Sequence, residues 1–149
     1  MPTYRSGLSS AQTLKASSVV TAAGSVNVTA VDGLGNYKQA QFLLDVTAAA
    51  TGAGDTLDVY IDTSPDGGTT WVNIVHFTQV LGNGGAKKMW ATVDPGGAPG
   101  TAVIAVTSDA ASGVVRPSMF CDTVRVRHVV ADGGSALQSF TFSVKAFFK

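Results

Sequence analysis

The side chains with catalytic or metal-binding chemistry are few and far apart in this chain. Two histidines, His76 and His128, lie in separate apolar stretches, and Cys121 is the only cysteine. Glutamate is absent, so all ten acidic residues are Asp. A zinc site or a catalytic triad needs several such groups to converge. We therefore expect no enzyme activity and no cofactor, and each histidine is predicted to be a strand residue with one satisfied hydrogen bond.

The stretch around Asp66 begins like a calcium loop. Asp62, Ser64 and Asp66 take the first, third and fifth positions of such a loop. Its twelfth position should be a bidentate Glu but is Asn73. Asp62 and Asp66 are thus weak candidates for a cation site, and we expect no bound metal.

The same stretch fits a second pattern better. Residues 64–71 read SPDGGTTW and resemble the Asp-box of sialidases and related propellers, Ser-x-Asp-x-Gly-x-Thr-Trp. In that family the box is a structural hairpin, remote from the catalytic site and present in several copies. A single copy predicts a braced turn, in which Asp66 accepts bonds from backbone amides and glycine permits a positive φ. The five matching positions are Ser64, Asp66, Gly68, Thr70 and Trp71.

Composition narrows the function further. The chain has 149 residues, of which 45% are hydrophobic and 13% charged, and its formal net charge is zero. A nucleic-acid binder that depends on counterion release needs a basic surplus, so nucleic acid is not an expected partner. No apolar run is long enough to cross a membrane, and the N-terminus lacks the apolar region of a secretory signal. Low charge suits a subunit whose surface is covered by copies of itself or by a larger body.

Alternating apolar and polar residues, separated by glycine-rich turns, predict an all-β chain. We expect about eight antiparallel strands in a β-sandwich or jelly roll over residues 19–149, preceded by a flexible polar arm over residues 1–18. The strand near residues 39–49 is apolar on both faces at its centre, which predicts that both faces are covered. The expected strand segments are 26–30, 39–49, 55–63, 71–80, 87–93, 103–106, 124–130 and 140–146.

Two arginines, Arg125 and Arg127, alternate with valines and so share one face of their strand. Guanidinium groups in this arrangement suit either a phosphate or carboxylate ligand or ion pairs with Asp. We expect ion pairs with Asp residues across a subunit boundary.

Taken together, several phrases resemble small virion proteins of tailed bacteriophages, in particular head decoration (cement) proteins and related head-fibre proteins. They are FLLDVTA at 42–48, DTLDVYID at 55–62, SPDGGTTW at 64–71 with Phe77-Thr78, VRVR at 124–127, and FTFSV at 140–144 after Gly133-Gly134. The resemblance spans residues 24–146. It implies a jelly-roll subunit, usually a homotrimer, made in the host cytoplasm. It also implies binding to the major capsid protein lattice on the outside of the phage head, where such proteins clamp the shell against DNA pressure.

The polar arm is expected to take part in this contact, because Tyr4, Arg5 and Leu8 lie near its start. With Arg125 and Arg127 they are the candidate contacts to the capsid or to another subunit. Two alternatives remain at this stage. One is a tail- or fibre-associated module that binds carbohydrate through Trp71, Trp90 or Tyr60, which an exposed aromatic side chain beside polar groups would favour. The other is an unrelated secreted or surface adhesin.

Overall fold

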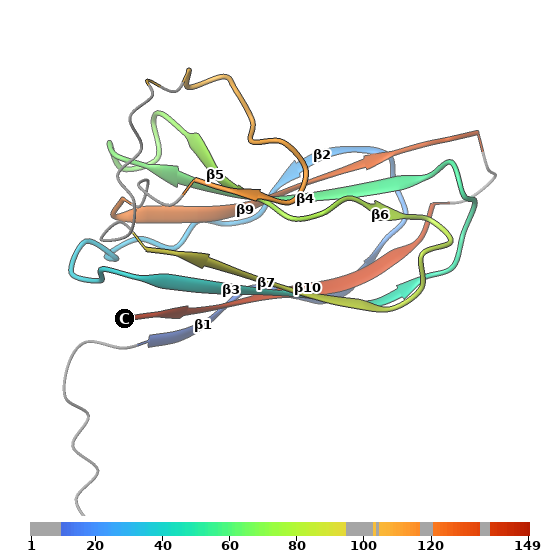
Figure 1. Cartoon of the computed structure of the whole chain (residues 1–149), viewed down its shortest axis with the longest axis horizontal. Helices are drawn as coiled ribbons and strands as arrows, with labels where there is room; N and C mark the ends of the chain where they lie inside the picture. The colour runs from blue at the N-terminus through green and yellow to red at the C-terminus, as the bar shows by residue number, and fades with distance from the viewer. Residues whose placement is uncertain (1–9, 95–102, 104, 117–120, 135–137) are drawn as a thin grey trace, which may run out of the picture.

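The chain folds into two stacked antiparallel β-sheets in a computed structural model, which describes residues 10–94, 103, 105–116, 121–134 and 138–149. Figure 1 shows the two layers edge-on. Sheet A contains, in spatial order, β1 (Ser10–Val20), β10 (Phe140–Phe148), β3 (Ala40–Ala49) and β7 (Lys87–Val93). Sheet B contains β2 (Gly24–Asn27), β9 (Thr123–Ala131), β4 (Thr56–Ser64), β5 (Val72–His76) and β8 (Val114–Val115), while β6 (Val80–Leu81) pairs with β4.

The strand order is that of a jelly roll. Eight of the described strands have four or more residues, and they divide into the orders β1-β10-β3-β7 and β2-β9-β4-β5. The first and last described strands pair with each other in sheet A, and successive strands largely pass from one sheet to the other. No described residue is helical, so no helix in the described ranges has the length and apolar character that a membrane span requires. The predicted all-β sandwich is confirmed.

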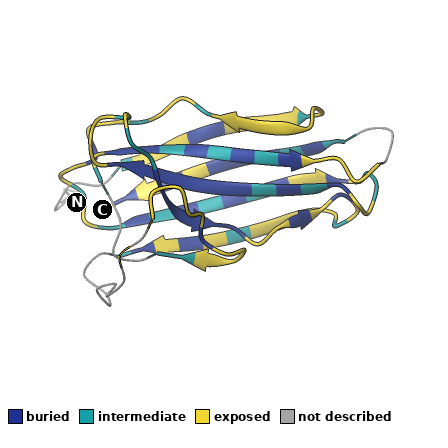
Figure 2. Ribbon diagram, turned by 90° about the horizontal axis from the view of Figure 1, so that it is seen from above, coloured by how far each residue is buried: buried dark blue, intermediate teal, exposed yellow. Residues whose placement is uncertain are grey.

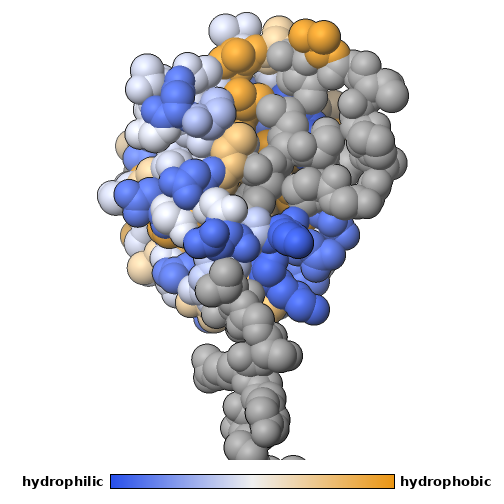
Figure 3. All heavy atoms as spheres, turned by 90° about the vertical axis from the view of Figure 1, so that its left-hand side faces the viewer, coloured by the Kyte–Doolittle hydropathy of each residue, from blue (hydrophilic) through white to orange (hydrophobic). Residues whose placement is uncertain are grey.

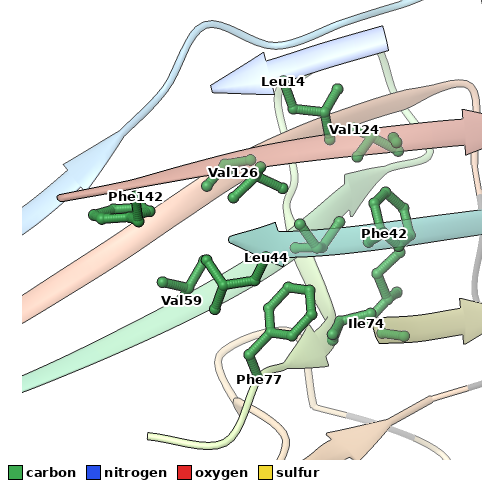
Figure 4. Packing of buried hydrophobic residues seen from close by; sticks show 14 of the residues in the cluster. Leu14, Phe42, Leu44, Val59, Ile74, Phe77, Val124, Val126 and Phe142 are labelled. Carbon is green, nitrogen blue, oxygen red and sulfur yellow. The ribbon is translucent and has the colours of Figure 1, made fainter. Parts of the chain in front are cut away.

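Period-two patterning places the core between the sheets. On β4, Leu57, Val59 and Ile61 point inward and are buried. Phe42 and Leu44 on β3 and Phe140 and Phe142 on β10 all belong to sheet A and line the other side of the same core, and Figure 4 shows part of this packing. Figure 2 shows buried segments running through the central strands, with exposed residues gathered on edge strands and turns. The alternation read from the sequence is therefore confirmed for these strands.

Two sequence expectations about sheet A need correction. The polar arm was placed at residues 1–18, but residues from Ser10 onward form β1, which pairs along its length with β10. As an edge strand β1 is largely exposed and polar, and it buries only Leu14 and Lys15. The strand β3 was expected to be covered on both faces, yet Leu43 lies on the open outer face of sheet A and is only half-buried.

The expected strand at 103–106 is also wrong for its described residues, which lie in the long connection from β7 to β8. Val103 and Val106 are exposed there. Figure 1 shows that this connection passes over the outer side of sheet B. Figure 3 views the end of the sandwich at the left of Figure 1, and its exposed hydrophobic atoms gather at the top, on that side of the molecule.

Candidate functional site

Charged and aromatic side chains gather on the outer face of sheet B. Strand register brings them together: Tyr60 on β4 lies opposite Arg127 on β9 and His76 on β5, while Asp62 lies opposite Arg125 and Asn73. All of them point away from the core, because they occupy the alternate positions to Val59, Ile61 and Val126 on the same ladders. The site thus follows from alternation and pairing of three neighbouring strands.

Asp62 is the centre of this group. Its side chain is 3% exposed, and its Oδ2 lies 3.0 Å from Nε of Arg127 and 3.4 Å from Nε of Arg125. Arg127 also donates to Asp109 of the connection above the sheet. The described ion pairs of both arginines are therefore made within one chain, and the expectation that these arginines pair with Asp across a subunit boundary is corrected. Asp62 comes from β4 and the two arginines come from β9, which pairs with β4.

Each arginine also stacks on an aromatic ring. The guanidinium carbon of Arg125 lies 4.0 Å from the ring centre of Trp71, and that of Arg127 lies 4.0 Å from the ring centre of Tyr60. Burial lowers the pKa of Arg127, but the hydrogen bonds and charges of Asp62 and Asp109 outweigh it and raise that pKa overall. Burial, followed by the charge of Asp58, raises the pKa of Tyr60. The guanidinium group of Arg127 therefore stays charged, and the two arginines cover the two rings.

His76 completes the row on the other side of Tyr60, with the two rings stacked 4.2 Å apart. Its Nε2 lies 2.7 Å from Oδ1 of Asp58, and its Nδ1 lies 2.8 Å from the carbonyl oxygen of Ala110. Both ring nitrogens thus have an oxygen partner, one on the Asp58 side chain and one on the Ala110 backbone. One hydrogen bond was expected for each histidine, whereas His76 has two and fixes the long connection onto β5.

Asn73 is the residue that sequence reasoning missed as part of this site. Its Nδ2 donates to the carbonyl oxygen of Val75 at 3.0 Å and to Oδ1 of Asp62 at 3.1 Å. Its Oδ1 accepts the amide of Ala110 at 2.9 Å. Arg116 adds a second tie by donating to the carbonyl oxygens of Asn73 and Ser108. The connection is therefore attached to sheet B by polar contacts, which no local sequence pattern signals.

The SPDGGTTW segment forms a braced turn between β4 and β5. The Ser64 Oγ accepts the amide of Gly68 at 2.8 Å, and Oδ1 of Asp66 accepts the amide of Thr70 at 2.6 Å. The Thr70 backbone bond, followed by its side-chain bond, lowers the pKa of Asp66. Gly68 has a φ of 97°, and the Trp71 ring lies close against it. The structure contains the hydrogen bonds and the positive φ that the motif predicts.

Asp62 and Asp66 do not combine into a cation site. The oxygens of Asp62 face Arg125, Arg127 and the Asn73 amide, whereas those of Asp66 are turned into their own hairpin. Within the described ranges there is no group of three or more His, Cys, Asp or Glu side chains that could hold a metal ion. The positively charged neighbours of Asp62 supply the physical reason, because they would repel a cation.

His128 lies on the opposite, inward face of β9. It is 3% exposed and packs edge-on against Phe142, and its Nδ1 has no hydrogen-bond partner among the described residues. Burial, followed by the charge of Lys15, lowers the pKa of His128. Lys15 itself is buried and donates to the carbonyl oxygen of Phe142 at 3.1 Å, and burial lowers its pKa. The expectation of one satisfied hydrogen bond is therefore not met at Nδ1 of His128.

The outer face of sheet A carries the most exposed aromatic side chain that the structure describes. Trp90 on β7 is 60% exposed and lies opposite Leu43 on β3, which in turn lies opposite Lys145 on β10. Phe147, two residues beyond Lys145 on the same face, is 41% exposed. All six lysines of the chain lie on or beside strands of sheet A: Lys15, Lys38, Lys87, Lys88, Lys145 and Lys149. Lys15 is buried, whereas Lys88 and Lys145 are exposed, so this face combines an apolar patch with exposed lysines.

The sequence-predicted contact residues are placed only in part. Arg125 and Arg127 lie in the polar cluster on sheet B, while Tyr4, Arg5 and Leu8 lie outside the described residues.

The three aromatic residues expected as carbohydrate platforms differ in exposure. Tyr60 and Trp71 are covered by arginines, so only Trp90 presents an open ring.

The fold belongs to the jelly-roll class found in viral capsid proteins, and comparison with solved structures gives examples. The chain is similar to VP2 in a crystal structure of an infectious bursal disease virus VP2 subviral particle, with a TM-score of 0.54 and 8% identity. Structures of the Gx and Gt strains of that virus match with TM-scores of 0.53 and 0.52, at 8% and 11% identity. These matches cover 95–97% of this chain and about a third (32–33%) of the viral chains. No protein-family model and no curated protein matches the sequence.

Proposed function

We propose that the chain is a structural protein of a virus particle, and specifically a decoration protein on the outside of an assembled phage head. The observation that carries this proposal is the jelly roll itself, which this chain shares with a protein that forms a subviral particle. The sequence resemblance to phage head proteins supports the same role. The proposal includes a homotrimer bound to the major capsid protein lattice, with no enzyme activity.

The outer face of sheet A is the side that we assign to the shell. The centre of a protein interface is enriched in Trp and Phe and depleted of charge. On this face, Trp90, Leu43 and Phe147 supply apolar side chains of that kind. The only acid on the strands of sheet A is Asp45, which pairs with Lys88 at 3.5 Å, so Lys145 remains uncompensated. An acidic surface of a shell subunit complements this face. Sheet B is partly covered by its own connection, which makes it the less open side.

Sedimentation with shells tests the proposal. The native protein should sediment with assembled shells of the major capsid protein of the same phage, and it should not bind the unassembled capsid protein. Trp90→Ser should lower occupancy at limiting concentration at least tenfold, since an exposed aromatic anchor at an interface contributes 2 kcal/mol or more, by rough estimate. Val26→Thr is the matched control, because Val26 is 50% exposed on sheet B. Equal occupancy of native protein and Trp90→Ser would remove sheet A from the contact.

The trimer and the N-terminal segment have their own tests. Light scattering at tens of micromolar should give the mass of three chains, and a strict monomer contradicts the trimer. Deleting residues 2–9 removes Tyr4, Arg5 and Leu8 but stops short of β1, which begins at Ser10. That deletion should leave the circular dichroism unchanged and weaken shell occupancy. Full occupancy would show that this segment makes no contact with the shell.

A second function, a tail- or fibre-associated module that binds carbohydrate, is favoured by the exposure of Trp90. A sugar ring stacks on an open indole face, and the lysines beside it suit acidic sugars. A glycan array separates the two functions, because this alternative predicts binding of a defined glycan that Trp90→Ser abolishes. The decoration role predicts that the native protein gives no stronger signal on the array than Trp90→Ser does.

A further inference from the structure

A hollow of about 330 Å³ lies on the outer face of sheet B, beside the first half of β9. It is lined by Trp71 and Arg125 on one side and by Thr107 and Asp109 of the connection above the sheet on the other. Asp62 and Arg127 of sheet B also line it. The hollow therefore places a ring, a hydroxyl and two guanidinium groups around one open space.

The two arginines of the hollow are not equivalent. Arg127 has its hydrogen-bonding edge filled, since Nε and Nη2 both bond to Asp62 and Nη2 also bonds to Asp109. Arg125 has a single hydrogen bond, from Nε to Asp62 at 3.4 Å. Its Nη1 and Nη2 have no partner in the part of the chain that the structure describes, although its side chain is only 17% exposed. The terminal donors of Arg125 are thus open to an acceptor in the hollow.

Trp71 fixes the orientation of that unused edge. The guanidinium carbon lies 4.0 Å from the centre of the indole ring, so the ring covers the guanidinium from one side. A fork of two parallel N–H groups matches the two oxygens of a carboxylate.

We propose that this hollow is a carboxylate-binding site, in which Nη1 and Nη2 of Arg125 receive both oxygens of the ligand. The Thr107 hydroxyl donates from the far side. The negative charges of Asp62 and Asp109 are balanced by Arg125 and Arg127 together, so the ligand's carboxylate is held through the open Nη1–Nη2 edge of Arg125. The ligand is either a free organic acid or an Asp or Glu side chain of a partner protein. The site does not depend on the virion role.

Nuclear magnetic resonance of the native protein tests the site directly. Sodium acetate replaces sodium chloride at constant ionic strength, and the indole Nε1–H signals of Trp71 and Trp90 are followed. We expect a saturable shift of Trp71 and of Arg125 Nε–H, with half-saturation on the order of 10 mM. Trp90 on sheet A is the internal control and should not move. Parallel, linear shifts of both tryptophans would overturn the proposal without any variant being needed.

Two variants and two further probes complete the design. Arg125→Lys keeps the charge but loses the fork, and it should weaken acetate binding at least tenfold. Lys145→Met removes one positive charge from sheet A and should leave the binding unchanged. Inorganic phosphate that binds more tightly than acetate contradicts a carboxylate site. A blocked Gly-Gly-Glu-Gly-Gly peptide that binds at least tenfold more tightly than acetate identifies a protein side chain as the source, and equal binding identifies a free acid. The Glu→Gln peptide must not bind.

Discussion

Replacing Asn73 with alanine should detach the connection over sheet B and cost the protein a large part of its stability. The Nδ2 hydrogens are shared among the carbonyl oxygens of Ile61 and Val75 and the Asp62 carboxylate, and Oδ1 accepts the Ala110 amide. Two donated hydrogens and one accepted bond make three hydrogen bonds. Asn73 is 3% exposed, so water does not replace them. At about 1 kcal/mol net for each, the loss in the free energy of unfolding is about 3 kcal/mol.

Urea denaturation of the native protein and of Asn73→Ala measures this loss. Hydrogen exchange adds a local readout, because the Ala110 amide should be protected in the native protein and exchange much faster in the variant. Asn27→Ala is the matched control. Asn27 is an exposed residue of β2 that lies opposite Arg127 of β9. Its effect should stay within about 0.5 kcal/mol. If Asn73→Ala also stays within that range, the amide does not hold the connection and the reasoning from buried hydrogen bonds is refuted.

Two further predictions concern His128 and the braced turn. Because burial and Lys15 lower the pKa of His128 below its unfolded value of about 6.5, the stability that depends on its neutral ring is complete above pH 6.5 and is lost as the pH falls through the lower, folded pKa. The free energy of unfolding should fall between pH 7.5 and 5.5 in the native protein and fall less in His128→Leu; equal slopes would contradict this. Ser64→Ala removes the acceptor of the Gly68 amide and should lower that free energy by about 1–2 kcal/mol, whereas Ser25→Ala on exposed β2 should not change it. An unchanged melting temperature in Ser64→Ala would show that Ser64 does not brace the turn.

Strands with regular alternation were predictable from the sequence because one side of each faces a shared core. Leu57, Val59 and Ile61 point inward for this reason, and the adjacent positions form the polar site. β1 was not predictable in the same way. It is an edge strand with water on most of its surface, so it carries few apolar residues, and its stability comes from pairing with β10.

The polar site was also predictable only in part. The shared face of Arg125 and Arg127 followed from period-two spacing, but their partner did not. Asp62 lies more than sixty positions away in the chain, and only the pairing of β4 with β9 brings it beside them. The contacts of Asn73 and His76 with Ala110 depend on how a long connection returns to the sheet. A local sequence pattern does not predict such a contact between distant segments.

The most direct test of the decoration role is a cryo-electron microscopy comparison of phage particles made with the gene intact and with the gene deleted. The proposed function predicts extra density on the outer surface of the head in particles with the intact gene, in a form that accommodates three copies of this two-sheet sandwich. The flat outer face of sheet A, with Trp90, should meet the shell. Density on the tail or inside the head, or identical maps from the two preparations, would contradict it.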